Sequence, residues 1–315
     1  MSANANSTAK EGGRGGTEKK KKPFDLVNRG IKEPTPGGTL AFIGLRLADM
    51  PLQKALLAPS TTGLGARLLG LLGLRTIFTH PSPAINSSQV LPLGAISSPA
   101  SRLAENNNTS VFFSSPLTSL SPTGLILFLM SCGSAAKQIY WLLCLSQESF
   151  PVSAAAAVSG YNTLVNTANS LLFIALATTS AVSFPRLTFV SPHVAFPLST
   201  IVGTLLYVAG MTIETLAERQ RAKFKAAPEN KGKVCKIGLW RWARHVNYFG
   251  YSLWRGGYCM VATGWIGGLA MGIWQGWDLN TRATLALDTY CANRYGPQWE
   301  QFKKEVPYKI IPGIY

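Results

Sequence analysis

Long stretches of this sequence contain no aspartate, glutamate, lysine or arginine. Four of them lie between the following pairs of charged residues: Glu105 and Lys137, Glu148 and Arg186, Arg186 and Glu214, and Arg255 and Asp278. Each is longer than the ~20 residues that a helix needs to cross the hydrocarbon core of a bilayer. Because charged side chains raise the free energy of insertion, this pattern argues against a soluble protein with buried helices. We expect an all-α, polytopic membrane bundle of about five to seven transmembrane or re-entrant helices.

The net charge of +16 is concentrated in two places, and their positions do not indicate a nucleic-acid partner. One cluster, Lys19 to Lys22, lies in a polar tail that we predict to be disordered over residues 1–36. The other runs from Arg219 to Arg244 between two apolar stretches, as cytoplasmic segments of membrane proteins do. The sequence therefore predicts a lipid bilayer as a partner, with the basic loop 218–246 and the C-terminus on the cytoplasmic side.

Residues 37–118 form a predicted N-terminal region of weakly apolar helices followed by a polar loop. Charged residues interrupt the segment 38–79, which could cross the membrane once or form two short or interfacial helices. The loop 80–118 contains two N-glycosylation sequons. A lumenal loop would agree with a cytoplasmic basic loop if the intervening helices each cross once.

Residues 119–315 form the predicted membrane domain. Prolines fall at or near the ends of its apolar stretches, as they do at helix boundaries. We expect long helices at about 120–146, 152–181 and 193–217.

The last apolar stretch contains glycines at 256–257 and in the region 264–268, where a helix could break. A hairpin of two helices at about 248–263 and 265–295 is favoured over a single span. The hairpin would return the polar C-terminus to the side of the basic loop.

The cysteines and histidines give little support to a metal site. No two of the five cysteines have CxxC spacing, and the three histidines are far apart in the sequence. We predict no metal.

Several polar residues fall where lipid or neighbouring helices are expected. Lys137 either faces a partner or a cavity, or extends its side chain to the interface. Asn162, Asn166 and Asn169 share one helical face, so they either bond to neighbouring helices or line a polar cavity. The candidate residues for a substrate site or cavity are Lys137, Asn162, Asn166, Tyr251 and Arg255.

The heptapeptide RHVNYFG, residues 244–250, lies where the basic run meets an apolar stretch. Arg244 can pair with phosphate in a bidentate manner, Asn247 can bind an amide or ribose, and Tyr248 can stack on a ring. No GxGxxG motif follows a strand, which excludes a Rossmann domain. These residues favour a phosphate-bearing cofactor bound between membrane helices.

Three sequence blocks carry a family resemblance. They are TIETLAERQRAKFKAAPENKGK at 212–233, GLWRWARHVNYFG at 238–250 and RYGPQWEQFKKEVPYKIIPGIY at 294–315. The second resembles the RHPNYFG-type signature of the steroid 5-alpha-reductase C-terminal-like membrane family, in its domain-of-unknown-function branch. The third resembles the C-terminus of the related sterol reductases. The resemblance covers about residues 120–315.

This resemblance implies a membrane protein of the endoplasmic reticulum that uses NADPH to reduce a carbon–carbon double bond in a sterol, steroid or other lipid. Where relatives often carry an acid after NYFG, this chain has Tyr251, and catalytic residues are not assigned. The cofactor-binding residues that the resemblance implies are Arg244, His245, Asn247, Tyr248, Arg282, Asp288 and Tyr290.

Two other functions fit the same segment. The isoprenylcysteine carboxyl methyltransferase group has a similar RHPxYxG segment, so one alternative is a membrane methyltransferase that uses S-adenosylmethionine. The other is a non-catalytic, lipid-binding family member, since Tyr251 replaces the acid. The sequence specifies neither the substrate nor the oligomeric state.

Overall fold

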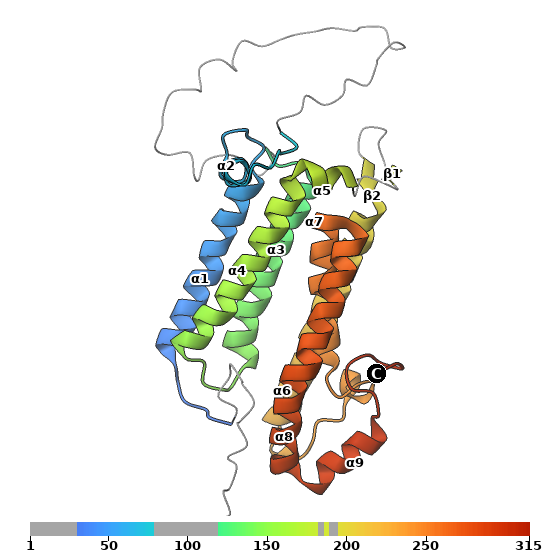
Figure 1. The fold of residues 1–315 in the computed structure, drawn as a ribbon. Helices are drawn as coiled ribbons and strands as arrows, with labels where there is room; N and C mark the ends of the chain where they lie inside the picture. Colours follow the sequence, from blue (N-terminus) through green and yellow to red (C-terminus); the bar gives the residue numbers. More distant parts are fainter. Residues whose placement is uncertain (1–29, 79–118, 182–185, 189–194) are drawn as a thin grey trace, which may run out of the picture.

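The computed structural model describes residues 30–78, 119–181, 186–188 and 195–315. Within these ranges the fold is helical, apart from a short antiparallel pair of strands (Figure 1). Most of the predicted disordered tail and the loop with its sequons lie outside the described residues.

Nine α-helices and two strands form the described architecture, with short π and 3-10 segments between them. The helices are α1 (Pro36–Leu57), α2 (Leu64–Leu71), α3 (Pro122–Tyr140), α4 (Val152–Ile174), α5 (Leu176–Ala181), α6 (Leu198–Ala226), α7 (Val246–Asp278), α8 (Thr284–Tyr295) and α9 (Pro297–Glu305). The strands are β1 (Arg186–Thr188) and β2 (Ala195–Pro197), with Leu187 opposite Phe196. The π segments are η3 (Trp141–Leu145) and η6 (Leu279–Ala283), and the 3-10 segments are η4 (Pro228–Asn230) and η5 (Gly238–Arg241).

The predicted long helices are confirmed, with shifted ends. Pro151 and Pro197 are the N-cap residues of α4 and α6, as the proline positions indicated. The backbone of Ala175 is extended, so the predicted helix 152–181 divides into α4 and α5. Helix α6 continues to Ala226, beyond the predicted end, because its last turns pack on the following loop.

The N-terminal region contributes to the bundle. The segment 38–79 forms one long helix, α1, and a short one, α2, and α1 packs against α3 and α4 (Figure 1). A cluster of Phe42, Leu142 and Phe150 fills one end of this contact, with the rings of Phe42 and Phe150 edge to face at 5.3 Å.

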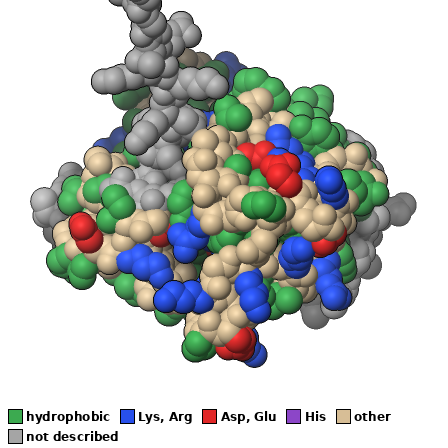
Figure 2. Space-filling view, turned by 90° about the horizontal axis from the view of Figure 1, so that it is seen from below, with side chains coloured by type: hydrophobic (Ala, Val, Ile, Leu, Met, Phe, Trp, Pro, Cys, Tyr) green, Lys and Arg blue, Asp and Glu red, His purple; other side chains and the backbone are tan. Residues whose placement is uncertain are grey.

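Three described segments are long and apolar enough to cross a membrane: 122–145, 198–226 and 246–295. The expected five to seven spanning or re-entrant helices are thus shown only in part. Helices α1 and α4 are not among these three segments, and both carry polar side chains that are buried between helices. Seen from the end where α8 and α9 lie, lysine and arginine side chains are spread over the surface and acidic ones are fewer (Figure 2).

The predicted hairpin is confirmed, and the single-span alternative is wrong. Gly264 has a φ of 73°, a conformation that glycine adopts without steric cost, and here the helix reverses. The two arms of α7 then lie against each other, because a Cβ placed on Gly256 would be 3.0 Å from the carbonyl oxygen of Gly268.

Helix α6 and the first arm of α7 also make backbone contact. A Cβ on Gly203 would lie 2.7 Å from the carbonyl oxygen of Gly257, and one on Gly210 would lie 2.5 Å from that of Gly250. Real Cβ atoms do not approach so closely. Small residues allow this kind of helix contact in membranes, where dispersion contacts replace the hydrophobic effect.

Candidate functional site

The RHVNYFG segment lies at the start of α7, near α8 and the end of the chain (Figure 1). His245 is the N-cap residue of α7. The backbone N–H of Arg244 donates to the carbonyl oxygen of Tyr308 at 3.0 Å, and that of His245 donates to Lys309 at 2.8 Å. Residues 306–315, which we call the C-terminal strap, therefore lie directly against this segment.

The side chain of Arg244 is held by the same strap. Its Nη1 donates to the carbonyl oxygens of Val306, at 2.8 Å, and Pro307, at 3.0 Å. Burial lowers the pKa of Arg244, and the charge of Asp288 opposes this shift. The Oδ1 atom of Asp288 is buried and has no hydrogen-bond partner among the described residues. The structure thus brings two of the predicted site residues together, and it leaves one carboxylate oxygen available.

A glutamate of α6 completes the polar side of this site. Glu218, which is buried, accepts a hydrogen bond from Nδ2 of Asn247 at 2.8 Å and pairs with Arg221 at 2.9 Å. The Oδ1 atom of Asn247 is buried without a partner in the described part of the chain. The rings of His245 and Tyr248 are stacked, with centroids 5.4 Å apart.

The remaining predicted cofactor residues contact their own helical neighbours. Arg282 donates to both carboxylate oxygens of Asp278, at 3.0 and 2.7 Å. The hydroxyl of Tyr290 accepts a hydrogen bond from Arg294 at 2.6 Å. A ligand role was predicted for Arg282, and the structure gives its guanidinium a carboxylate partner four residues away. The ligand role of both residues stays a prediction.

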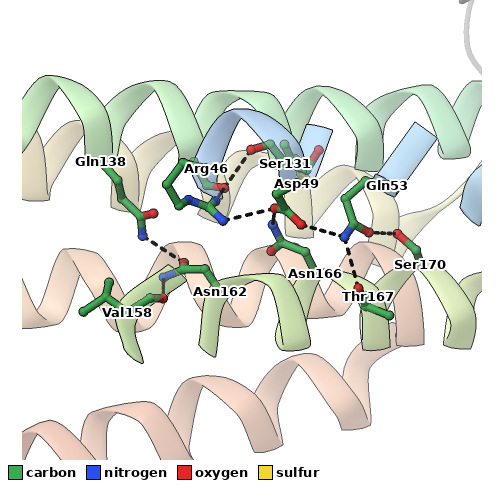
Figure 3. Close-up of polar contacts among 12 residues, drawn as sticks. Arg46, Asp49, Gln53, Ser131, Gln138, Val158, Asn162, Asn166, Thr167 and Ser170 are labelled. Carbon is green, nitrogen blue, oxygen red and sulfur yellow. Dashed lines mark hydrogen bonds and ion pairs between the residues drawn. The ribbon is translucent and has the colours of Figure 1, made fainter. Parts of the chain in front are cut away.

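A second set of predicted residues belongs to a polar network between α1, α3 and α4 (Figure 3). Asp49 accepts hydrogen bonds from Arg46 at 3.1 Å, from Gln53 at 2.9 Å and from Asn166 at 2.7 Å. Ser170 donates to Oε1 of Gln53 at 2.7 Å. All five side chains are buried, so Asn166 bonds to a neighbouring helix.

Asn162 extends the network to α7. Its Oδ1 accepts hydrogen bonds from Gln138, at 2.8 Å, and from the guanidinium of Arg255. Arg255 is completely buried, and its Nε donates to the hydroxyl of Tyr251 at 3.2 Å. Its guanidinium carbon also lies 4.4 Å from the ring centroid of Trp254. Of the predicted cavity residues, Asn162, Tyr251 and Arg255 thus form one connected group.

Lys137 faces a partner rather than extending to the interface. Its ammonium pairs with the carboxylate of Glu214 on α6, and both side chains are largely buried. The other oxygen of Glu214 accepts a hydrogen bond from Trp254 at 2.7 Å. This ion pair joins α3 to α6 and balances the charge of each residue.

No site role was predicted for the two glutamates of α6 that bind these polar side chains. Glu214 and Glu218 are four residues apart and share a face of α6, and this spacing was the available signal. Arg46, Asp49 and Gln53 are likewise spaced to share one face of α1. Arg46 and Asp49 were treated only as charged interruptions of an apolar segment, and Gln53 was not considered.

An apolar cavity of about 420 Å³ lies beside the RHVNYFG segment. The two arms of α7, Leu206 of α6 and the C-terminal strap enclose it. Among the described residues, no aspartate, glutamate, lysine or arginine side chain lines it. Within the described ranges, no group of three histidine, cysteine, aspartate or glutamate side chains could hold a metal ion.

The chain is similar to proteins of two enzyme classes. Residues 158–280 match the family described as Protein of unknown function (DUF1295). The protein named probable O-methyltransferase ustE from Ustilaginoidea virens is 30% identical over 280 residues, which cover 88% of this chain and 87% of that protein. This chain belongs to the DUF1295 family.

The DUF1295 chain is distantly related to sterol reductases as well. The Delta(14)-sterol reductase of Neurospora crassa is 30% identical over 159 residues, covering 36% of this chain and 32% of the reductase. The 7-dehydrocholesterol reductase of Danio rerio is 29% identical over 91 residues, covering 27% of this chain and 18% of the reductase. This similarity confirms the predicted family relationship. Because the chain spans only a part of these reductases, the similarity does not show that it catalyses their reaction.

Proposed function

We propose that this protein is a membrane methyltransferase that uses S-adenosylmethionine to methylate an oxygen atom of an apolar acceptor. The observation that carries this proposal is the similarity to a probable O-methyltransferase over 88% of the chain and 87% of that relative. Similarity to the sterol reductases is confined to about a third of the chain, for instance 36% for the fungal Delta(14)-sterol reductase. The methyltransferase, an alternative at the level of sequence, is therefore favoured over NADPH-dependent reduction.

The charges of the site support the same choice. NADPH carries several phosphate charges, but Nη1 of Arg244 already donates to strap carbonyls and Arg282 already pairs with Asp278. Nε of Arg244 is a buried donor of that side chain that is left without a partner among the described residues. Asp288, with an unpartnered carboxylate oxygen, would repel phosphate. S-adenosylmethionine instead has a net positive charge from its sulfonium and ammonium groups. A site with a free carboxylate oxygen suits a cationic cofactor better.

The residues present fit several parts of S-adenosylmethionine. In this proposal Asp288 binds the ammonium or the ribose hydroxyls, and Oδ1 of Asn247 accepts from an amino group. The stacked His245 and Tyr248 provide ring faces for adenine. When bound, S-adenosylmethionine would supply an electrophilic methyl group. The acceptor oxygen would form the new C–O bond as the S–CH3 bond breaks, which leaves S-adenosylhomocysteine, and the hydroxyl proton would be released to water.

A binding experiment tests this proposal. The purified protein in lipid nanodiscs is heated with S-adenosylmethionine, S-adenosylhomocysteine or NADPH, since a ligand stabilises the folded state that it binds. We expect the first two to raise the unfolding midpoint and NADPH to leave it unchanged. Asp288→Asn removes the carboxylate charge and should weaken S-adenosylmethionine binding about tenfold. Glu300→Gln, an exposed carboxylate on α9, is the control.

The other outcomes decide between the remaining functions. Stabilisation by NADPH alone would support the second candidate, a lipid double-bond reductase, which the partial similarity to sterol reductases favours. If neither S-adenosylmethionine nor NADPH changes the unfolding midpoint, both enzymatic functions are overturned and a lipid-binding role remains. We also propose that the protein lies in the endoplasmic reticulum membrane, with the basic loop 218–246 on the cytoplasmic side.

A further inference from the structure

The apolar cavity is a slot between the two arms of α7. Its walls include Leu253 and Met260 on the first arm, and Leu269 and Ile273 on the second. Glycines on the second arm keep the slot open, because a Cβ on Gly276 would meet no atom closer than Oγ of Ser252, at 3.5 Å. A side chain at position 276 could therefore project into the slot without a backbone clash.

The slot opens on the apolar face of a candidate membrane span. Leu269 and Ile273 line it, yet they are 56% and 71% exposed, and Trp277 beside them is 62% exposed. Large apolar side chains exposed on a candidate membrane span are in contact with lipid tails rather than with water. A hydrophobic molecule dissolved in the bilayer can therefore reach the slot without crossing water.

The side chains at one end of the slot are polar but uncharged. Asn280 lines this end and lies in the π segment η6, a type of helix irregularity that often occurs at functional sites. Its Nδ2 donates to the hydroxyl of Tyr315 at 3.1 Å. Ser252 adds a second hydroxyl to the lining. These groups can bind a hydroxyl, but the described part of the chain places no lysine or arginine in the lining to neutralise a carboxylate or phosphate.

The C-terminal strap joins this slot to the proposed cofactor site. Its first half holds Arg244 through the carbonyls of Val306 and Pro307. Its second half supplies Ile310 and Tyr315 to the lining of the slot. The polar end of the slot and the RHVNYFG segment therefore both contact the same ten-residue strap.

We infer that the slot binds the acceptor of methyl transfer, a slender, neutral, membrane-soluble alcohol or phenol whose hydroxyl lies at Asn280 and Tyr315. This inference rests on the proposed function and names its substrate class. A cavity of about 420 Å³ is within the range of small-molecule sites. The uncharged lining disfavours a phospholipid headgroup, since burying an unpaired charge is costly.

Photo-crosslinking tests this inference independently of the reaction. The full-length protein in nanodiscs is irradiated with a diazirine-bearing hexadecanol, and labelled peptides are mapped. Diazirine-bearing hexadecane and phosphatidylcholine serve as the matched probes without a hydroxyl and with a charged headgroup. We expect hexadecanol to label residues 265–280 and the strap, and an excess of unlabelled hexadecanol to compete.

Two variants and one control locate the site. Gly276→Leu should lower hexadecanol labelling about tenfold, because the new side chain removes space for several methylene groups. Tyr315→Phe should lower it about fivefold by the loss of one hydrogen bond, and should not alter hexadecane labelling. Gly160→Leu adds the same side chain on α4, where no atom lies within 4 Å, and should change nothing.

The outcomes separate this inference from the proposed function. Equal labelling by phosphatidylcholine, or labelling unaffected by Gly276→Leu, would overturn the inference and assign the slot to bilayer lipid. If S-adenosylmethionine binds in the thermal experiment but hexadecanol labelling fails, the inference alone is wrong. If hexadecanol labels the slot and S-adenosylmethionine does not bind, the methyltransferase proposal is wrong and a binding site for apolar alcohols remains.

Discussion

Helices α1, α3 and α4 meet through hydrogen-bonded polar side chains, whereas α6 and α7 meet through glycines that bring their backbones together. In the first region Asp49 of α1 accepts hydrogen bonds from its own helix and from Asn166 of α4. The Arg46 side chain with which it pairs is 0% exposed. In the second region Gly203 and Gly210 of α6 face Gly257 and Gly250 of α7.

The two kinds of contact have different consequences. A polar network has few alternative arrangements, because each displaced group would be left unpaired in an apolar environment. Glycine contacts fix the distance between backbones but leave space wherever a side chain is missing. The cavity beside α7 lies in the glycine-rich region. The molecule thus separates a region specialised for a fixed arrangement from one that provides a binding space.

Removing the acid at the centre of the network should give the largest effect on stability. Asp49→Asn leaves the guanidinium of Arg46 buried without its counter-charge, so we expect destabilisation of about 3–5 kcal/mol. The unfolding midpoint of the protein in nanodiscs measures this change. The double variant Arg46→Met with Asp49→Asn should recover most of the loss, because no uncompensated charge remains.

If the double variant were no more stable than Asp49→Asn, charge pairing would not be what holds this region. The polar network between α1, α3 and α4 would then not be what distinguishes this region from the glycine contacts of α6 and α7.

Adding a single methyl group between α6 and α7 should lower the stability by a smaller but clear amount. In Gly257→Ala the added Cβ would lie 2.5 Å from the carbonyl oxygen of Gly203, so α6 and α7 must separate. We expect destabilisation of about 1–3 kcal/mol, as for other over-packed interiors. Gly160→Ala is the matched control, since its new methyl meets nothing within 4 Å and alanine favours a helix.

An unfolding midpoint for Gly257→Ala equal to that of Gly160→Ala would show that backbone contact between α6 and α7 is not essential.

The smallest effect is expected from an ion pair in water. Lys236 and Glu305 are 2.7 Å apart and both are exposed, and the hydrogen bond from Lys236 holds the pKa of Glu305 below its usual value. A carboxyl with a lowered folded-state pKa contributes stability above its unfolded pKa and loses it as the pH falls through the folded value. The wild type should therefore lose slightly more stability than Glu305→Gln as the solution is acidified from neutral pH.

Parallel unfolding curves of the two proteins against pH would show no contribution from this pair. A difference as large as that of Asp49→Asn would contradict the contrast between buried and exposed charges.

Elements with a local sequence signal could be predicted. Prolines marked the starts of α4 and α6, and the glycine at position 264 marked the reversal of α7. The three asparagines of α4 shared a face, but the identity of the facing helix is a property of tertiary packing. That is why the pairing of Asn166 with Asp49 was not foreseen.

The candidate site was predictable in part. The RHVNYFG segment and Asp288 were identified from the sequence, and the structure places Asp288 in electrostatic range of Arg244. The role of Glu218 was missed, because an acid in a basic run looks like a solvated side chain until its partner Asn247 is known. The cavity had no sequence signal, since an absence of side-chain volume becomes visible only when helices are packed.

The reversal at Gly264 also bears on how the protein enters the membrane. Both arms of α7 begin or end at the side where α8 and α9 lie, and residues 265–270 beyond the turn contain no charged side chain. A segment of this kind can be inserted as a preformed hairpin, because no charged group has to be transferred to the far side. We therefore expect the last membrane segment to need only the passage of a short apolar turn during biosynthesis.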